Sequence, residues 1–98
     1  MRMHPNEAPV QADVWDDLRL PPAEAQNLRI RSAMLRALED FLAEKKLTKS
    51  RAAKLLGVTQ ARVVALAKGK INEFSLDDLI GLLSKAGIKV DVHVRRVA

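Results

Sequence analysis

The sequence contains no cysteine, which excludes disulfide bonds and thiolate metal sites. Its two histidines, His4 and His93, are too few for a metal site built from three or four histidines. The longest uninterrupted apolar run, Val63 to Ala67, is five residues long, whereas a membrane-spanning helix needs about 20. The first seven residues contain no apolar stretch of the kind found in signal peptides. We therefore expect a cytoplasmic protein that contacts no membrane.

Patterns that carry catalysis are missing as well. The sequence has no combination of serine, histidine and aspartate spaced for nucleophilic catalysis, no glycine-rich phosphate loop and no spacing of metal ligands. The paired carboxylates Asp77 and Asp78 follow Ser75, and a helix beginning there explains them because its dipole favours negative charge. We expect neither an enzyme nor a cofactor or metal site.

The chain does have the length and composition of one small helical domain. It has 98 residues, of which 48% are hydrophobic, and leucine and alanine dominate that set, which favours helix over sheet. All four prolines fall within residues 1–22, which we interpret as an acidic N-terminal arm. Residues 23–98 are expected to form a mainly α-helical domain with one C-terminal strand.

Apolar spacing and capping residues predict four helices in this domain. Residues 23–46 repeat apolar side chains every three to four positions. Three shorter helices are each preceded by a capping residue and followed by a glycine. They are expected at 49–56, 60–68 and 76–86, after Thr48, Thr59 and Ser75. Their expected core residues are Ala52, Ala53, Leu55, Leu56, Val63, Leu66, Ala67, Leu76, Leu79, Ile80 and Leu83.

The last segment changes to a period of two. Ile88, Val90, Val92 and Val94 alternate with polar residues, which is typical of a strand with one apolar face. A lone strand leaves its backbone groups unpaired. We expect it to pair with the same strand of a second copy in a homodimer; pairing with arm residues 10–15 is the alternative.

Positive charge is concentrated in one part of the chain. The net charge is +5, and residues 48–72 carry six lysine and arginine residues and no acid. Such a field favours a polyanion, with nucleic acid as the first candidate. The same window contains two short helices joined by Gly57, a pattern that predicts a helix-turn-helix over residues 49–68. The alternative is a pair of core helices with a solvated basic face.

The second helix of this motif is expected to enter the major groove of double-stranded DNA. Base readout is assigned to Gln60, Ala61, Arg62, Val64, Ala65 and Lys68. Among these, glutamine suits adenine, arginine and lysine suit guanine or phosphate, and small apolar groups suit thymine methyls. Phosphate contacts are assigned to Lys49, Ser50, Thr59 and Lys70.

A family resemblance extends these predictions. It rests on residues 13–18 followed by Leu20-Pro21, on Leu47-Thr48, on Ala52-Ala53-Lys54-Leu55-Leu56-Gly57-Val58-Thr59-Gln60, on residues 66–70, on Phe74-Ser75-Leu76-Asp77-Asp78-Leu79 and on Gly87-Ile88-Lys89-Val90. From Val14 to Val94 the sequence resembles the HigA-like antitoxins, whose helix-turn-helix is of the XRE (Cro/repressor) type. The resemblance implies a lambda-repressor-like fold of about four helices and a RelE/HigB-like ribonuclease toxin as partner. It also implies that a dimer represses the shared operon, and two-fold symmetry predicts a near-palindromic operator.

The acidic arm is the segment expected to contact the toxin. Its carboxylates Asp13, Asp16 and Asp17 suit the basic RNA-binding surface of a ribonuclease, with Trp15 and Leu18 as apolar contacts. The alternative is that Trp15 and Leu18 cover the protein's own core. Two other functions remain open, a stand-alone XRE-type repressor without a toxin and a protein-interaction module that has lost DNA binding.

The sequence departs from the family pattern within the motif itself. The family often has glutamine at the position of Lys49, an acid near Arg51, proline at Ala61 and serine at Val64. The changes at Lys49 and Arg51 make this chain more basic. The change at Val64 removes a hydroxyl able to bond phosphate or base, so the operator sequence cannot be carried over from the family.

Overall fold

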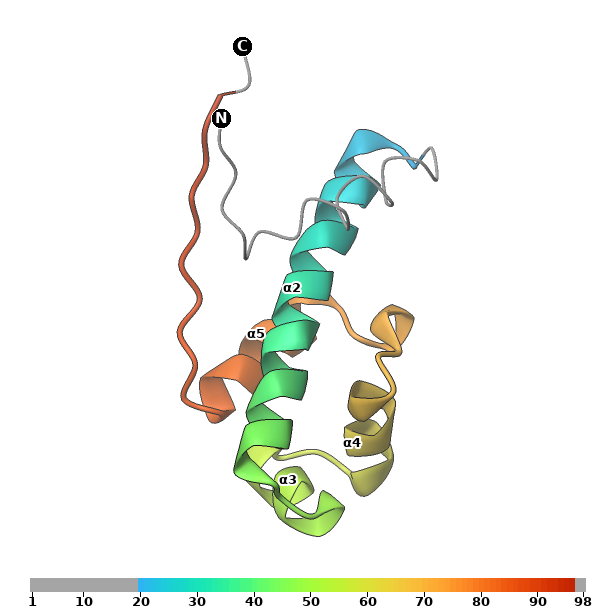
Figure 1. Cartoon of the computed structure of the whole chain (residues 1–98). Coiled ribbons are helices and arrows are strands. Elements are labelled where there is room, and N and C mark those ends of the chain that lie inside the picture. The colour runs from blue at the N-terminus through green and yellow to red at the C-terminus, as the bar shows by residue number, and fades with distance from the viewer. Residues whose placement is uncertain (1–19, 97–98) are drawn as a thin grey trace.

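The computed structural model describes residues 20–96, which form helices joined by short turns. In chain order these are α2 (Pro22–Lys45), α3 (Lys49–Leu56), α4 (Gln60–Ala67), the 3-10 helix η2 (Ile71–Glu73) and α5 (Leu76–Lys85). In Figure 1, α2 forms the long axis of the molecule, α3 and α4 lie toward its C-terminal end, and α5 crosses it. The prediction of a mainly α-helical fold is confirmed for these residues. No helix among them is both long and apolar enough to cross a membrane.

Local sequence explains where each short helix begins. The hydroxyls of Thr48 and Thr59 each accept the backbone N–H three residues further on, at 3.1 and 3.2 Å. Helix α5 begins with a reciprocal pair, in which the Ser75 hydroxyl accepts the Asp78 N–H and the Asp78 carboxylate accepts the Ser75 N–H, both at 3.0 Å. These side chains satisfy backbone donors that a helix start leaves unpaired. The three predicted capping residues are confirmed.

The turn between α3 and α4 depends on Gly57. Its φ of 71° lies in the left-handed region, where an ordinary L-residue costs about 1–2 kcal/mol. The Val58 N–H closes the turn by donating to the Ala53 carbonyl at 3.0 Å. Glycine therefore permits the sharp turn that sets the angle between the two helices.

The main core lies where α4, α5 and η2 face α2. One side chain of α3, Leu56, also reaches this core. The largest fully buried side chains of the core are Leu38, Leu56, Leu66, Phe74, Leu79 and Leu83. A second, smaller cluster of Ala52, Ala53 and Val63 holds α3 against α4. Small side chains allow the backbones of two helices to approach closely. This second cluster therefore fixes α3 and α4 as a unit.

Some side chains that were expected in the core are exposed. They are Leu55 (42% exposed), Ile80 (46%) and Ala67. In α5 the buried positions are Leu79, Leu82 and Leu83 instead. For Ile80 the reason is that α2 packs on the side of α5 that carries Leu79, Leu82 and Leu83, and a single neighbouring helix covers only one side of α5.

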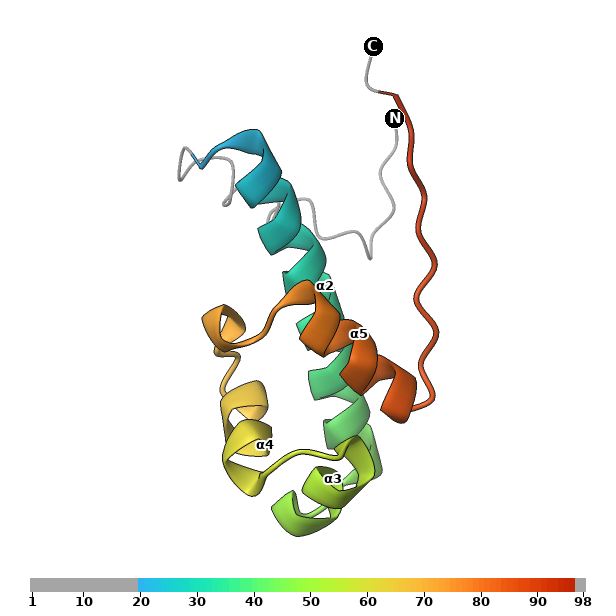
Figure 2. The same ribbon diagram turned by 180° about the vertical axis from the view of Figure 1, so that it is seen from behind.

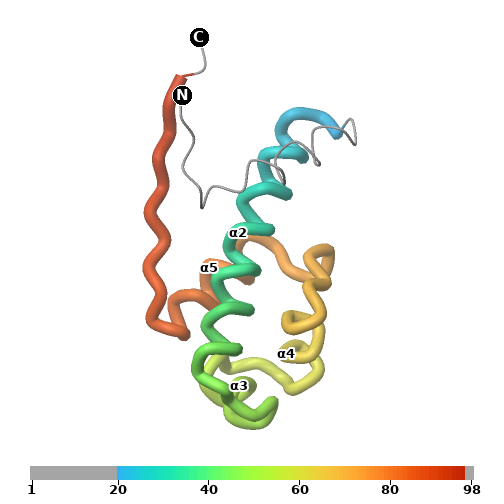
Figure 3. The backbone as a smooth tube through the Cα atoms, viewed as in Figure 1, coloured from blue at the N-terminus to red at the C-terminus, as the bar shows by residue number. Residues whose placement is uncertain are grey.

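Beyond α5, residues 88–96 are extended but form no β-strand. The predicted strand of Ile88, Val90, Val92 and Val94 is therefore not seen. Within the described residues no backbone-to-backbone hydrogen bond reaches residues 89–96, and an extended segment without a partner has no ladder to form. The alternative partner at residues 10–15 lies outside the described range. Figures 1 and 3 show the segment running back in the direction opposite to α2.

Candidate nucleic-acid interface

Helices α3 and α4 form a tightly connected pair inside the basic window. Only residues 57–59 separate them, and the cluster of Ala52, Ala53 and Val63 packs them together. Figure 2 shows the pair at the end of the molecule away from the start of α2. Two short helices with a turn of about three residues are the arrangement of a helix-turn-helix, whose second helix enters the major groove. In this chain that second helix is α4.

Three of the predicted base-reading residues lie on one accessible side of α4, and Lys68, the residue that caps its C-terminal end, continues the same side. Gln60, Ala61 and Lys68 are exposed, and Val64 is half-buried. Because side chains four residues apart lie above one another on a helix, Gln60, Val64 and Lys68 form one row, with Ala61 beside it. The structure thus presents an amide, two small apolar groups and an ammonium group together.

Ala65 is not available for contact with DNA. It is 7% exposed and belongs to the main core cluster, as does its neighbour Leu66. The expectation that Ala65 faces outward is wrong. The physical reason is that α4 packs against both α3 and the main core, which widens its buried side beyond what the sequence pattern indicated.

Arg62 also differs from the expectation, because its guanidinium is engaged within the protein. Its Nη1 donates to the Glu73 carbonyl at 2.8 Å. Its Nη2 lies 3.6 Å from the Asp78 carboxylate, and its Cζ lies 4.3 Å from the centroid of the Phe74 ring. These contacts hold the side chain toward the connection between η2 and α5 rather than beside Gln60.

The Asp78 carboxylate that faces Arg62 is ionised at neutral pH. The hydrogen bond from the Ser75 backbone N–H is the main reason that the pKa of Asp78 lies below its ordinary value of 3.8, and the Arg62 charge adds to it. Because folding lowers the pKa of Asp78, its ionised carboxylate stabilises the fold at pH values above the ordinary pKa of 3.8. This stabilisation is lost as the pH falls through the lower pKa of the folded state. The pair with Arg62 therefore persists through the neutral range.

The predicted phosphate contacts occupy exposed positions around α3 and α4. Lys49 and Ser50 lie in the first turn of α3, Thr59 precedes α4 and Lys70 follows it. The Thr59 hydroxyl accepts a backbone N–H of α4 and can still donate its own proton. Cations and helix starts both suit phosphate oxygens.

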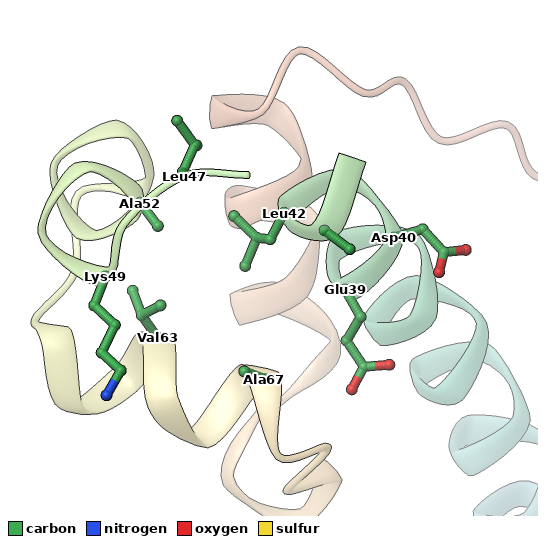
Figure 4. Close-up of a pocket in the computed structure, with 9 residues that line it drawn as sticks. Glu39, Asp40, Leu42, Leu47, Lys49, Ala52, Val63 and Ala67 are labelled. Carbon is green, nitrogen blue, oxygen red and sulfur yellow. The ribbon is translucent and has the colours of Figure 1, made fainter. Parts of the chain in front are cut away.

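A groove of about 530 Å³ lies between this helix pair and α2. Figure 4 shows Lys49 and Val63 on the side of α3 and α4, with Leu42 and Glu39 on the α2 side. Partial burial is the main reason that the pKa of Glu39 lies above its ordinary value of 4.5, and the negative charge of neighbouring Asp40 raises this pKa further. Within residues 20–96 no group of three or more acidic or histidine side chains is placed to hold a metal ion. The groove thus adds a largely apolar recess beside the basic surface.

An arginine that the sequence reasoning missed anchors the segment after α4. Arg31 of α2 donates from Nη1 to the carbonyls of Ile71 and Phe74 at 2.9 and 3.2 Å, and from Nε to the Asn27 side chain at 2.6 Å. It therefore links α2 to η2. Its position in the sequence could have indicated this role. Arg31 lies four residues before Leu35, so it is on the buried side of α2.

The predicted partner contacts lie in two segments of the chain. The residues predicted to contact a toxin lie outside the described range: Asp13, Trp15, Asp16, Asp17 and Leu18. Among the residues predicted to mediate dimerisation, Ile88 is half-buried against the main core. The other three, Val90, Val92 and Val94, are exposed. An apolar groove of about 530 Å³ beside this segment is lined by exposed Ile30 of α2 and Ile80 of α5.

Comparison with known proteins agrees with this geometry. A family model described as a helix-turn-helix domain matches residues 14–95, a range that includes every helix described above. A search of curated proteins gives no significant match to the chain.

Proposed function

Because the chain belongs to the helix-turn-helix domain family, we propose that it is a DNA-binding antitoxin that represses its own operon and neutralises a RelE/HigB-like ribonuclease toxin. DNA binding is the part that the family and the α3–α4 geometry support directly. The observation that carries it is the accessible row of Gln60, Val64 and Lys68 within a window of six cations and no acid.

In this proposal α4 lies in the major groove and its accessible side reads base edges. The Gln60 amide both donates and accepts, which matches the N6 and N7 groups of adenine. Ala61 and Val64 are small enough to contact thymine methyl groups, and Lys68 reaches guanine or the backbone. Phosphate contacts from Lys49 and Lys70 set the position of the helix without reading sequence.

We extend the proposal to a homodimer formed through the C-terminal segment. Residues 89–96 have no backbone partner within the described chain, and exposed Val90 and Val92 border the apolar groove beside Ile30 and Ile80. Pairing with the same segment of a second copy satisfies these backbone groups and covers the apolar surface. Two-fold symmetry then places two α4 helices about 34 Å apart, on a near-palindromic operator.

The antitoxin part of the proposal rests on the family resemblance and on the charge of the arm. Residues 1–22 carry four carboxylates against two arginines. An acidic segment complements the basic surface with which a ribonuclease binds RNA. In this proposal the arm neutralises the toxin while α4 remains available for DNA, and both activities take place in the cytoplasm.

The antitoxin proposal predicts that a small basic reading frame beside the gene encodes a protein that co-purifies with this chain. Deleting residues 1–21 is expected to lower the affinity for that protein about tenfold or more, because charge complementarity and apolar contacts are lost together. Titration by calorimetry measures the effect. Gln60→Ala is the control, since it changes the DNA side and is expected to leave this affinity unaltered. If the protein encoded by the neighbouring reading frame neither binds the full chain nor inhibits growth, the antitoxin proposal is wrong and the chain is a stand-alone repressor.

A further inference from the structure

We propose that Arg62 is a positioning residue for DNA recognition, which fixes the orientation of α4 instead of contacting a base. This inference rests on the proposed DNA-binding function and adds a residue that controls how the reading surface is presented. It is carried by the three contacts of the guanidinium, with the carbonyl of Glu73 in η2, the ring of Phe74 just after η2 and the carboxylate of Asp78 in the first turn of α5.

The contacts occupy different parts of the Arg62 guanidinium. One terminal nitrogen donates to the Glu73 carbonyl, the other faces the Asp78 carboxylate, and the flat face covers the Phe74 ring. Phe74 is 1% exposed and therefore forms a fixed platform. A planar guanidinium holds such a set of partners in one geometry, whereas a lysine ammonium acts as a mobile point charge.

Helix α4 is short, and Arg62 adds a directional contact to the apolar packing that holds it in place. It has eight residues, and helices of this length are not stable on their own in water. Its buried residues Val63 and Leu66 attach it through apolar burial, which is not directional. Hydrogen bonds are directional, so Arg62 limits the rotation of α4 and thereby the direction in which Gln60 and Val64 point.

Three roles for Arg62 make different predictions. If it reads a base, its replacement relaxes preference at one base pair of each half-site. If it contacts phosphate, its loss makes the salt dependence shallower by about one unit per contact. If it positions α4, preference falls at every base pair that α4 reads, while the salt dependence stays the same.

The first tests are Arg62→Lys, which keeps the charge and removes the planar fork, and Arg62→Ala, which removes the charge as well. Affinity is measured for an operator selected from random duplex DNA by the unaltered chain, for operators with single base-pair changes and for a scrambled duplex, each at several salt concentrations. We expect the operator-to-scrambled affinity ratio to fall about tenfold, as for the loss of one charge-assisted hydrogen bond. The fall is shared by the base pairs that α4 reads, and the salt slopes do not change.

A second pair of variants tests the sign of the effect. Asp78→Asn removes a negative charge beside Arg62 but keeps an oxygen able to accept the Ser75 N–H. If Asp78 acts only through its charge, its neutralisation makes binding to every duplex tighter. If it helps Arg62 to position α4, the operator-to-scrambled affinity ratio falls instead. We expect a fall of about twofold, which is small because the ion pair is partly exposed. Asp77→Asn is the matched control, with the same change of charge one residue away and no expected change in the ratio.

The operator-to-scrambled affinity ratio distinguishes a change in the orientation of α4 from a loss of fold stability. Measurements at a temperature where circular dichroism shows all variants folded exclude unfolding as a cause, because a merely destabilised protein keeps its ratio. Loss of preference at a single base pair, or a shallower salt slope, would overturn the positioning role of Arg62 while leaving the DNA-binding function intact. Failure of the unaltered chain to select any operator would instead overturn the proposed function, and this inference with it.

Discussion

Replacing Lys49, Lys68 and Lys70 together with alanine is expected to lower operator affinity about 10³–10⁴-fold at about 0.15 M salt. All three side chains are exposed around α3 and α4. Each phosphate contact releases a counterion. The proposed dimer loses four such contacts from Lys49 and Lys70, and two more where Lys68 reaches the backbone. The slope of log affinity against log salt is therefore expected to become shallower by about four to five units. Fluorescence anisotropy with a labelled operator, repeated across a salt series, measures both quantities.

The control removes the same number of positive charges from outside the basic window. Arg36→Ala, Lys45→Ala and Lys85→Ala change exposed residues of α2 and α5. Net charge alone acts weakly on a distant surface, because screening reduces interactions beyond about 8–10 Å at this salt concentration. We expect the control to change affinity less than about tenfold and to leave the slope nearly unaltered. Equal losses in the two triple variants would contradict the assignment of α3 and α4 as the DNA-binding surface.

Leu66→Ala is expected to destabilise the fold by about 2–5 kcal/mol, the range for truncating a large side chain in a packed core. Leu66 is 1% exposed and joins α4 to the main core. A chain of this size has a total stability of about 5–15 kcal/mol, so the loss is a large fraction of the total. Chemical denaturation followed by circular dichroism gives the free energy of unfolding.

Leu55→Ala provides the matched control for this change. The substitution is identical and lies in the neighbouring helix α3, but Leu55 is 42% exposed. We expect a loss below about 1 kcal/mol, since a partly exposed side chain leaves little cavity behind. Similar losses for Leu55→Ala and Leu66→Ala would contradict the burial described for α3 and α4.

Features that depend on nearby residues were predictable from the sequence. The beginnings of α3, α4 and α5 follow from Thr48, Thr59 and Ser75, because a capping hydroxyl acts on a backbone group three residues away. The turn at Gly57 follows from its tolerance of positive φ. These signals located the helix-turn-helix before any packing was known.

Features that depend on which elements meet were not predictable in the same way. Ala65 is buried because a second neighbour packs on α4, and nothing in the spacing of α4 records that neighbour. The contacts of Arg62 with Glu73 and Asp78 join residues 11 and 16 positions apart, through a connection whose path the sequence pattern does not give. The C-terminal strand requires a partner that residues 20–96 do not supply.

If the accessible side of α4 reads bases, Gln60→Ala changes the base preference of the protein. Affinities of the unaltered chain and of this variant are compared across operators that differ at single base pairs. We expect the variant to lose preference for adenine at one position of each half-site, worth about 1–3 kcal/mol, and to keep its preference elsewhere and its salt slope. An unchanged preference at every position would mean that α4 is not the helix that reads the bases.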